Sequence, residues 1–106
     1  MSVKELFDLK GKVAIVTGSS KGIGKAIAEA LAEYGAHVVV SSRSQEAVDT
    51  VADEFKAKGL ETIGIACHVG DEEQRKALID KTVNHYGGVD ILINNAATNP
   101  VYAPLE

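Results

Sequence analysis

Short apolar runs alternate along the chain with longer stretches in which apolar residues recur at helical spacing. The apolar runs at 12–17, 37–42, 62–67 and 89–94 predict four strands, of which the first is expected to be buried on both faces. The stretches between them predict three amphipathic helices. Their expected buried faces are Ile23, Ile27, Leu31 and Tyr34 in the first, Val48, Val51, Ala52 and Phe55 in the second, and Leu78, Ile79, Val83 and Tyr86 in the third.

The residues that flank these stretches are typical of helix ends. Ser44 and Asp71 are expected to cap the second and third helices, and Gln74 stands at capping-box spacing from Asp71. A glycine follows each helix, at the position where left-handed backbone geometry costs glycine least: Gly35, Gly59 and Gly87. Residues 95–106, which contain both prolines, are expected to form a loop.

Strand–helix alternation with short connections is typical of right-handed βαβ units. It predicts an α/β fold, with one domain over residues 1–106 and helices on both faces of a parallel sheet. A flavodoxin-type domain without a dinucleotide shows the same alternation, so the pattern by itself leaves that alternative open.

A glycine-rich turn, T-G-S-S-K-G-I-G at 17–24, joins the first strand to the first helix. Glycine permits positive φ angles and lets the backbone approach a bulky anion, while the helix N-terminus supplies free N–H groups. The turn therefore predicts a dinucleotide site and, with it, the strand order 3-2-1-4. An ordinary glycine-containing corner is the alternative for the turn alone. The cofactor-binding residues assigned here are Gly18, Ser20, Lys21, Gly22, Ile23 and Gly24.

The end of the second strand is where a ribose-reading residue belongs. An acidic residue there favours NAD, whereas an arginine accommodates the 2′-phosphate of NADP. This chain has Ser42 and Arg43 at that point, with Lys21 as a second cation in the glycine turn. These residues predict NADP(H) in preference to NAD(H), unless both cations are merely solvated loop residues.

Composition and charge narrow the classes of function. With 45% hydrophobic residues, 25% charged residues and a net charge of −4, the chain has the composition of a soluble domain and no basic cluster for nucleic acid. No apolar run reaches membrane-spanning length, and residues 1–7 lack the apolar core of a signal peptide. The single cysteine, Cys67, suits a reducing compartment. We therefore expect a cytoplasmic protein that binds neither nucleic acid nor a membrane.

The glycine turn together with Asn94-Asn95-Ala96-Ala97 after the fourth strand resembles the short-chain dehydrogenase/reductase family. The second motif of that family is Asn-Asn-Ala-Gly, and Ala97 here replaces the glycine. The resemblance implies a Rossmann-type sheet, truncated to about four strands, and a nicotinamide dinucleotide cofactor. It also implies that residues 94–96 fix the central sheet and line the ribose on the nicotinamide side. Asn95, Ala96 and Ala97 are accordingly assigned to the cofactor site.

His68 stands where the family commonly has an aspartate that contacts the adenine amino group. A neutral imidazole can accept the same hydrogen bond, so His68 and the following Val69 are assigned to the adenine side. A structural surface histidine is the alternative. Residues 67–70 and 94–100 are similar to the NADP-dependent carbonyl and retinal reductase branch of the family.

The family's hydride transfer, between NAD(P)(H) and a carbonyl or alcohol, depends on a tyrosine followed four residues later by a lysine. No such pair occurs in this chain, where Tyr34, Tyr86 and Tyr102 are followed at that distance by Val38, Asp90 and Glu106. The resemblance covers essentially all of this chain but only the first part of a usual family member. We therefore assign no catalytic residue and no metal ligand, and we expect the chain alone to be inactive.

The motifs and the resemblance to the family leave two hypotheses of function. The first is an NADP(H)-binding N-terminal part of a short-chain reductase, and the second is a non-catalytic module that binds nucleotide or self-associates. Residues 91–93 would form an apolar edge strand with unpaired backbone groups. This predicts a homo-oligomer, a dimer or larger, that assembles through the fourth strand, or else a poorly soluble monomer.

Overall fold

The computed structural model describes residues 8–95 and the backbone of residues 102–104. The elements in this part of the chain are β1 (Val13–Thr17), α2 (Gly22–Glu33), β2 (His37–Ser41), α3 (Gln45–Ala57), β3 (Thr62–Gly64), α4 (Glu72–Tyr86), β4 (Ile91–Asn94) and β5 (Tyr102–Pro104). None of these helices is long and apolar enough to cross a membrane.

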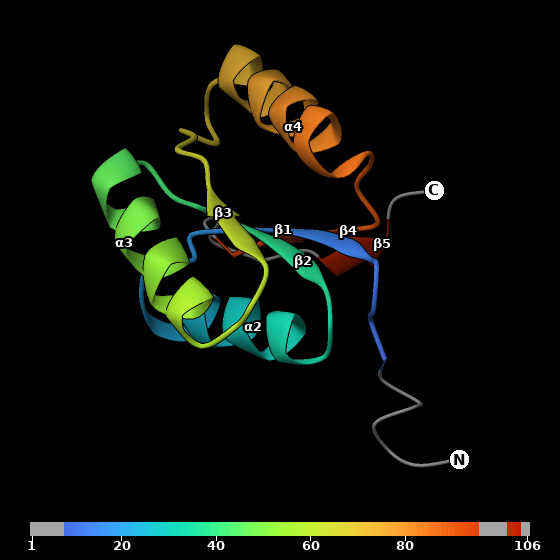
Figure 1. Ribbon diagram of the computed structural model, residues 1–106. Coiled ribbons are helices and arrows are strands. Elements are labelled where there is room, and N and C mark those ends of the chain that lie inside the picture. The colour runs from blue at the N-terminus through green and yellow to red at the C-terminus, as the bar shows by residue number, and fades with distance from the viewer. Residues whose placement is uncertain (1–7, 96–101, 105–106) are drawn as a thin grey trace.

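The sheet confirms the predicted strand order. β3, β2, β1 and β4 lie side by side in this order, and all three pairings between them are parallel. The helices α2 and α3 cover one face of the sheet, and α4 covers the other (Figure 1). Because the four strands point the same way, the segments that follow them meet at one edge, which we call the carboxyl edge.

β4 is not an edge strand, contrary to the expectation from the sequence. β5 pairs with it in antiparallel orientation, with Ile91 opposite Pro104 and Ile93 opposite Tyr102. Part of the expected loop at 95–106 is therefore a strand, because it takes up backbone groups that β4 would otherwise expose. The outer strands of the described sheet are β3 and β5. The expected homo-oligomer through β4 rested on an open edge at this strand and loses that basis.

The expected buried face of α3 is confirmed, since Val48, Val51, Ala52 and Phe55 are all buried. The expected face of α2 is correct only in part. Ile27 and Leu31 are half-buried and pack against the core, but Ile23 is 74% exposed and Tyr34 is 41% exposed. The buried residues of the helix are its smallest, Gly24, Ala28 and Ala32. Small side chains let the α2 backbone pack close to the sheet, and this close packing decides the face. In α4, the expected Val83 is 42% exposed, and Thr82 is buried in its place.

The helix ends follow the sequence with one exception. The side chains of Ser44 and Asp71 accept hydrogen bonds from the N–H groups of Ala47 and Gln74, both at 3.2 Å. The reciprocal half of the capping box is not formed. Because the Asp71 N–H donates to the His68 carbonyl, the side-chain oxygen of Gln74 accepts from the His68 N–H at 2.8 Å instead. Positive φ angles at the three glycines that follow the helices complete the predicted stops.

The small residues of α2 give a test of its close packing. Ala28 is fully buried, and we expect Ala28→Leu to lower the free energy of unfolding by about 1–3 kcal/mol through overpacking. Ala26 lies on the exposed side of the same helix, so Ala26→Leu should change it by less than about 0.5 kcal/mol. Urea unfolding measures both variants. Equal stability of the two would contradict a close approach of α2 to the sheet.

Candidate functional site

The glycine-rich turn leaves β1 with the backbone geometry that the sequence predicts. Gly18 and Gly22 have φ angles of +61° and +62°, a region that side chains disfavour. Ser19 between them is completely buried. Its hydroxyl donates to the Val16 carbonyl at 2.6 Å and accepts from the Ser41 N–H at 2.9 Å. Ser19 therefore links the turn by hydrogen bonds to the end of β1 and to the end of β2.

Gly24 brings the two sequence motifs into contact. A Cβ atom on Gly24 would overlap the Gly18 carbonyl oxygen and lie 2.6 Å from Asn95 Nδ2. Asn95 Nδ2 itself donates to the Gly18 carbonyl at 3.2 Å. One strand position earlier, Thr17 Oγ1 donates to Asn94 Oδ1 at 2.9 Å. The first turn of α2, the glycine turn and the end of β4 are therefore packed against one another with no room for a side chain.

The N-terminus of α2 differs from those of the other two helices. α3 and α4 have side-chain caps and carry acidic residues in their first turns. α2 begins after Lys21, with no side-chain cap and no acidic residue in its first turn. Its first N–H groups and its positive dipole end are thus left available to an anion.

The glycine turn opens on a pocket of about 220 Å³ at the carboxyl edge. The pocket unites six of the residues that the sequence assigned to the cofactor, namely Gly18, Ser20, Lys21, Ser42, Arg43 and Val69. Lys21 and Arg43 are exposed, and neither forms an ion pair with another described residue. Two unpaired cations beside an uncapped helix end make this pocket favourable for a polyanion.

Cys67 is the one residue of this pocket that the sequence did not assign to it. The thiol is buried, with 2% of the residue exposed. Burial raises its pKa, and the nearby Arg75 charge opposes that rise only in part. Cys67 therefore contributes a neutral, weakly polar wall rather than a charged group.

His68 lies at the carboxyl edge but does not line the pocket. Its Nδ1 accepts a hydrogen bond from the Gly70 N–H at 3.1 Å. In a neutral imidazole, the other nitrogen then carries the proton, so Nε2 is a donor. The sequence suggested that His68 accepts a hydrogen bond from the adenine amino group. The acceptor nitrogen, Nδ1, is already bonded to Gly70, so the free nitrogen, Nε2, would donate a hydrogen bond and not accept one.

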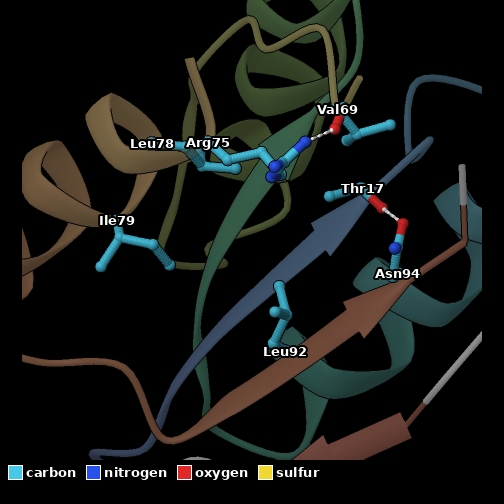
Figure 2. Close-up of a pocket in the computed structure, with 7 residues that line it drawn as sticks. All are labelled: Thr17, Val69, Arg75, Leu78, Ile79, Leu92 and Asn94. Carbon is cyan, nitrogen blue, oxygen red and sulfur yellow. Dashed lines mark hydrogen bonds between the residues drawn. The ribbon is translucent and has the colours of Figure 1, made fainter. Parts of the chain in front are cut away.

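A second pocket, of about 110 Å³, lies between α4 and the sheet. Figure 2 shows Leu78 and Ile79 of α4 above Leu92 of β4, with the bonded pair Thr17 and Asn94 at the strand ends. Val69 lines both pockets, and Arg75 Nη1 donates to its carbonyl oxygen. The mostly apolar walls of this second pocket make it a poor place for phosphates.

Tyr86 lies at the opposite end of the sheet from both pockets. Its ring contacts that of His37 at the start of β2, at 4.9 Å between centroids, and its hydroxyl donates to Glu61 at 3.0 Å. Burial and the Glu61 carboxylate together raise the pKa of Tyr86 well above its ordinary value. A tyrosine so placed and so protonated does not serve the carboxyl edge as an acid–base group.

The remaining assigned residues have different outcomes. Gly22 and Gly24 form the turn, Ile23 is exposed beside it, and Asn95 contacts Gly18. Ala96 and Ala97 lie outside the described residues.

Sequence reasoning did not assign to the site four residues whose side chains bond to its backbone: Ser19, Gln45, Gln74 and Arg75. Their positions in the turn and in the first turns of α3 and α4 were the available signal, but their partners are distant in sequence.

The parallel sheet has at its carboxyl edge a glycine-rich turn that leads into a helix without a side-chain cap. This arrangement defines a Rossmann-type domain. Residues 12–105 match the model of the short chain dehydrogenase family. The chain belongs to this family, and the family implies a nicotinamide dinucleotide as cofactor.

The similarity extends to individual proteins. The chain is 54% identical to tropinone reductase-like 3 of Erythroxylum coca, over 86% of this chain and 35% of that protein. It is 50% identical to human dehydrogenase/reductase SDR family member 4, over 92% of this chain and 35% of that protein. A hydroxysteroid dehydrogenase structure from Escherichia coli superposes with a TM-score of 0.84 at 38% identity, over 89% of this chain and 39% of that one. The chain thus spans about a third of the length of the curated relatives it matches.

The contact at Gly24 can be tested directly. We expect Gly24→Ala to lower the free energy of unfolding by about 1–3 kcal/mol, because the new methyl group forces Gly18 and Asn95 apart. Gly88 has open space around its Cβ position and no positive φ, so Gly88→Ala is the matched control. Thermal or urea unfolding compares the two variants, and a Gly24→Ala variant as stable as the control would refute the contact.

Proposed function

We propose that the chain binds NADP(H), with the pyrophosphate at the N-terminus of α2 and the adenosine 2′-phosphate between Lys21 and Arg43. The observation that carries the proposal is the uncapped start of α2, which opens on a pocket with two unpaired cations. Ser20 and Ser42 line the same pocket and supply hydroxyl donors for phosphate oxygens. Among the described residues, none that lines this pocket is acidic, whereas an acidic residue is the usual partner of the free 2′-hydroxyl of NAD.

The other parts of the cofactor have candidate partners along the carboxyl edge. Val69 offers an apolar surface for the adenine ring, and the neighbouring residue His68 has a ring nitrogen, Nε2, that can donate a hydrogen bond. Gly24 lets the first turn of α2 pack against Gly18 and Asn95, which holds the helix N-terminus at the glycine turn where the pyrophosphate is proposed to bind. Asn95 follows β4 on the side where the nicotinamide ribose is expected.

For the protein as a whole, we propose reversible hydride transfer between NADP(H) and a carbonyl or alcohol. The nicotinamide supplies the hydride chemistry when it is bound, and the described residues of this chain hold and orient the cofactor. We propose that this chain alone lacks the acid–base group, since no tyrosine is followed four residues later by lysine. A non-catalytic nucleotide-binding module is the alternative. A cytoplasmic location stays a prediction, supported by the single cysteine.

Fluorescence titration with NADPH and NADH tests the cofactor assignment. Arg43→Ala is expected to raise the dissociation constant of NADPH about tenfold while that of NADH stays within about twofold, because only NADPH carries the charge that Arg43 meets. Lys56→Ala, on the exposed side of α3, removes an equal charge far along the helix and should leave both constants unchanged.

The outcomes separate the hypotheses. Equal affinity of the unmodified chain for both cofactors would rule out the 2′-phosphate contact but retain a dinucleotide site. A folded chain that binds neither cofactor would refute the proposal and favour the self-associating module.

A further inference from the structure

β3 is an outer strand of the sheet, yet the outward-facing backbone groups at its end have partners. The N–H groups of Ile65 and Cys67 point inward and donate to the Val40 and Ser42 carbonyls, at 3.0 and 2.8 Å. The residues between and beside them face outward, where an edge strand ordinarily exposes unpaired groups. β3 ends at Gly64, although the sequence predicts a strand to residue 67.

The side-chain amide of Gln45 takes up these outward groups. Its Nε2 donates to the Gly64 carbonyl at 3.0 Å, and its Oε1 accepts from the Ala66 N–H at 2.9 Å. A residue of a neighbouring parallel strand makes the same two bonds, to the carbonyl before and the N–H after the residue it faces. The Gln45 amide therefore makes the two backbone hydrogen bonds that a strand residue opposite Ile65 would make.

Two further contacts extend and orient this arrangement. The next outward N–H, that of His68, donates to Gln74 Oε1 of α4 at 2.8 Å. On α3, the Asp49 carboxylate accepts a second hydrogen bond from Gln45 Nε2 at 2.7 Å. The amide of Gln45 is thus held in one orientation, with its donor side toward Gly64 and its acceptor toward Ala66.

The position of Gln45 in the chain connects this contact to the cofactor pocket. Gln45 is the first residue of α3 and follows Arg43 by two positions, while Ala66 precedes Cys67 and Val69 by one and three. Arg43, Cys67 and Val69 line the same pocket. Among the described residues, the side-chain hydrogen bonds from Gln45 are those between α3 and β3 that lie nearest to these pocket residues. The bond from Thr62 to the Ala52 carbonyl joins the start of β3 to the middle of α3.

We propose that Gln45 is a positioning residue for NADP(H): by replacing a strand along β3, it sets Arg43 at the correct distance from the adenine-side residues 67–69. The proposal rests on the proposed function, because it assigns Gln45 a role through the 2′-phosphate and adenine contacts of that pocket. Gln45 itself need not touch the cofactor.

The test compares Gln45→Met, Gln45→Asn and the control Lys56→Met in titrations with NADPH and NADH. Methionine keeps the length of the side chain without the amide, and asparagine keeps the amide on a stem too short for both bonds. Both Gln45 variants should raise the dissociation constant of NADPH about tenfold and that of NADH about threefold or less, since one to two hydrogen bonds no longer hold Arg43 in place. Lys56→Met should change neither constant.

The ratio of the two affinities distinguishes positioning from general destabilisation. A variant that only lowers the folded fraction weakens both cofactors by the same factor, so its NADPH-to-NADH ratio is unchanged. An unchanged ratio in the Gln45 variants would therefore overturn the inference while the proposed function stands. If Gln45→Met does not fold, Gln45→Asn decides by the same criterion.

Amide hydrogen exchange of the unmodified chain gives a check that needs no variant and no cofactor. The Ala66 N–H should exchange slowly, because Gln45 Oε1 accepts from it, and exchange at the rate of a free exposed amide would overturn the inference. An unmodified chain that binds neither cofactor would instead overturn the proposed function, and this inference with it.

Discussion

The close contact of three backbone segments around Gly24 is the constraint on which the carboxyl edge depends. The first turn of α2 lies so near the Gly18 carbonyl and Asn95 that no side chain fits between them. The same demand for close approach explains why the buried residues of α2 are Gly24, Ala28 and Ala32, while Ile27 and Leu31 pack at the side of this contact and stay half-buried. Ser19, a buried residue of the turn, bonds the turn to the ends of β1 and β2. A phosphate-sized ligand can therefore meet backbone N–H groups that the fold already holds in place.

The N-termini of α2, α3 and α4 differ in their caps and in the charges of their first turns. The N-termini of α3 and α4 are closed by Ser44 and Asp71 and by acidic first turns, so they stabilise the fold internally. The N-terminus of α2 has neither, and the pocket beside it is lined by the cations Lys21 and Arg43 and by no described acidic residue. The pocket is therefore positively charged although the net charge of the chain is −4. This distribution favours an anionic cofactor over any partner attracted by overall charge.

The backbone groups on the outer sides of β4 and β3 find hydrogen-bond partners in two different ways. β4 receives a short antiparallel partner, β5, whose residue Pro104 is compatible with an outer strand. β3 receives no strand, but the amides of Gln45 and Gln74 bond to its outward groups. Both arrangements reduce the number of backbone groups available for pairing with another chain. The second also connects the two segments that border the pocket at the carboxyl edge.

Much of the architecture could be predicted from the sequence, because local patterns determine it. The period of apolar residues located the four parallel strands and three helices, and the caps Ser44 and Asp71 and the terminal glycines set the helix ends. The glycine turn and Arg43 pointed to one edge of the sheet, since parallel strands necessarily end there together. The burial of the small residues of α2, the pairing of β5, and the contacts of Ser19 and Gln45 could not be predicted in this way. They depend on how closely elements pack and on partners far away in the sequence, such as the 19 positions between Gln45 and Gly64. Local periodicity carries no information on such distances, so only the tertiary structure decided them.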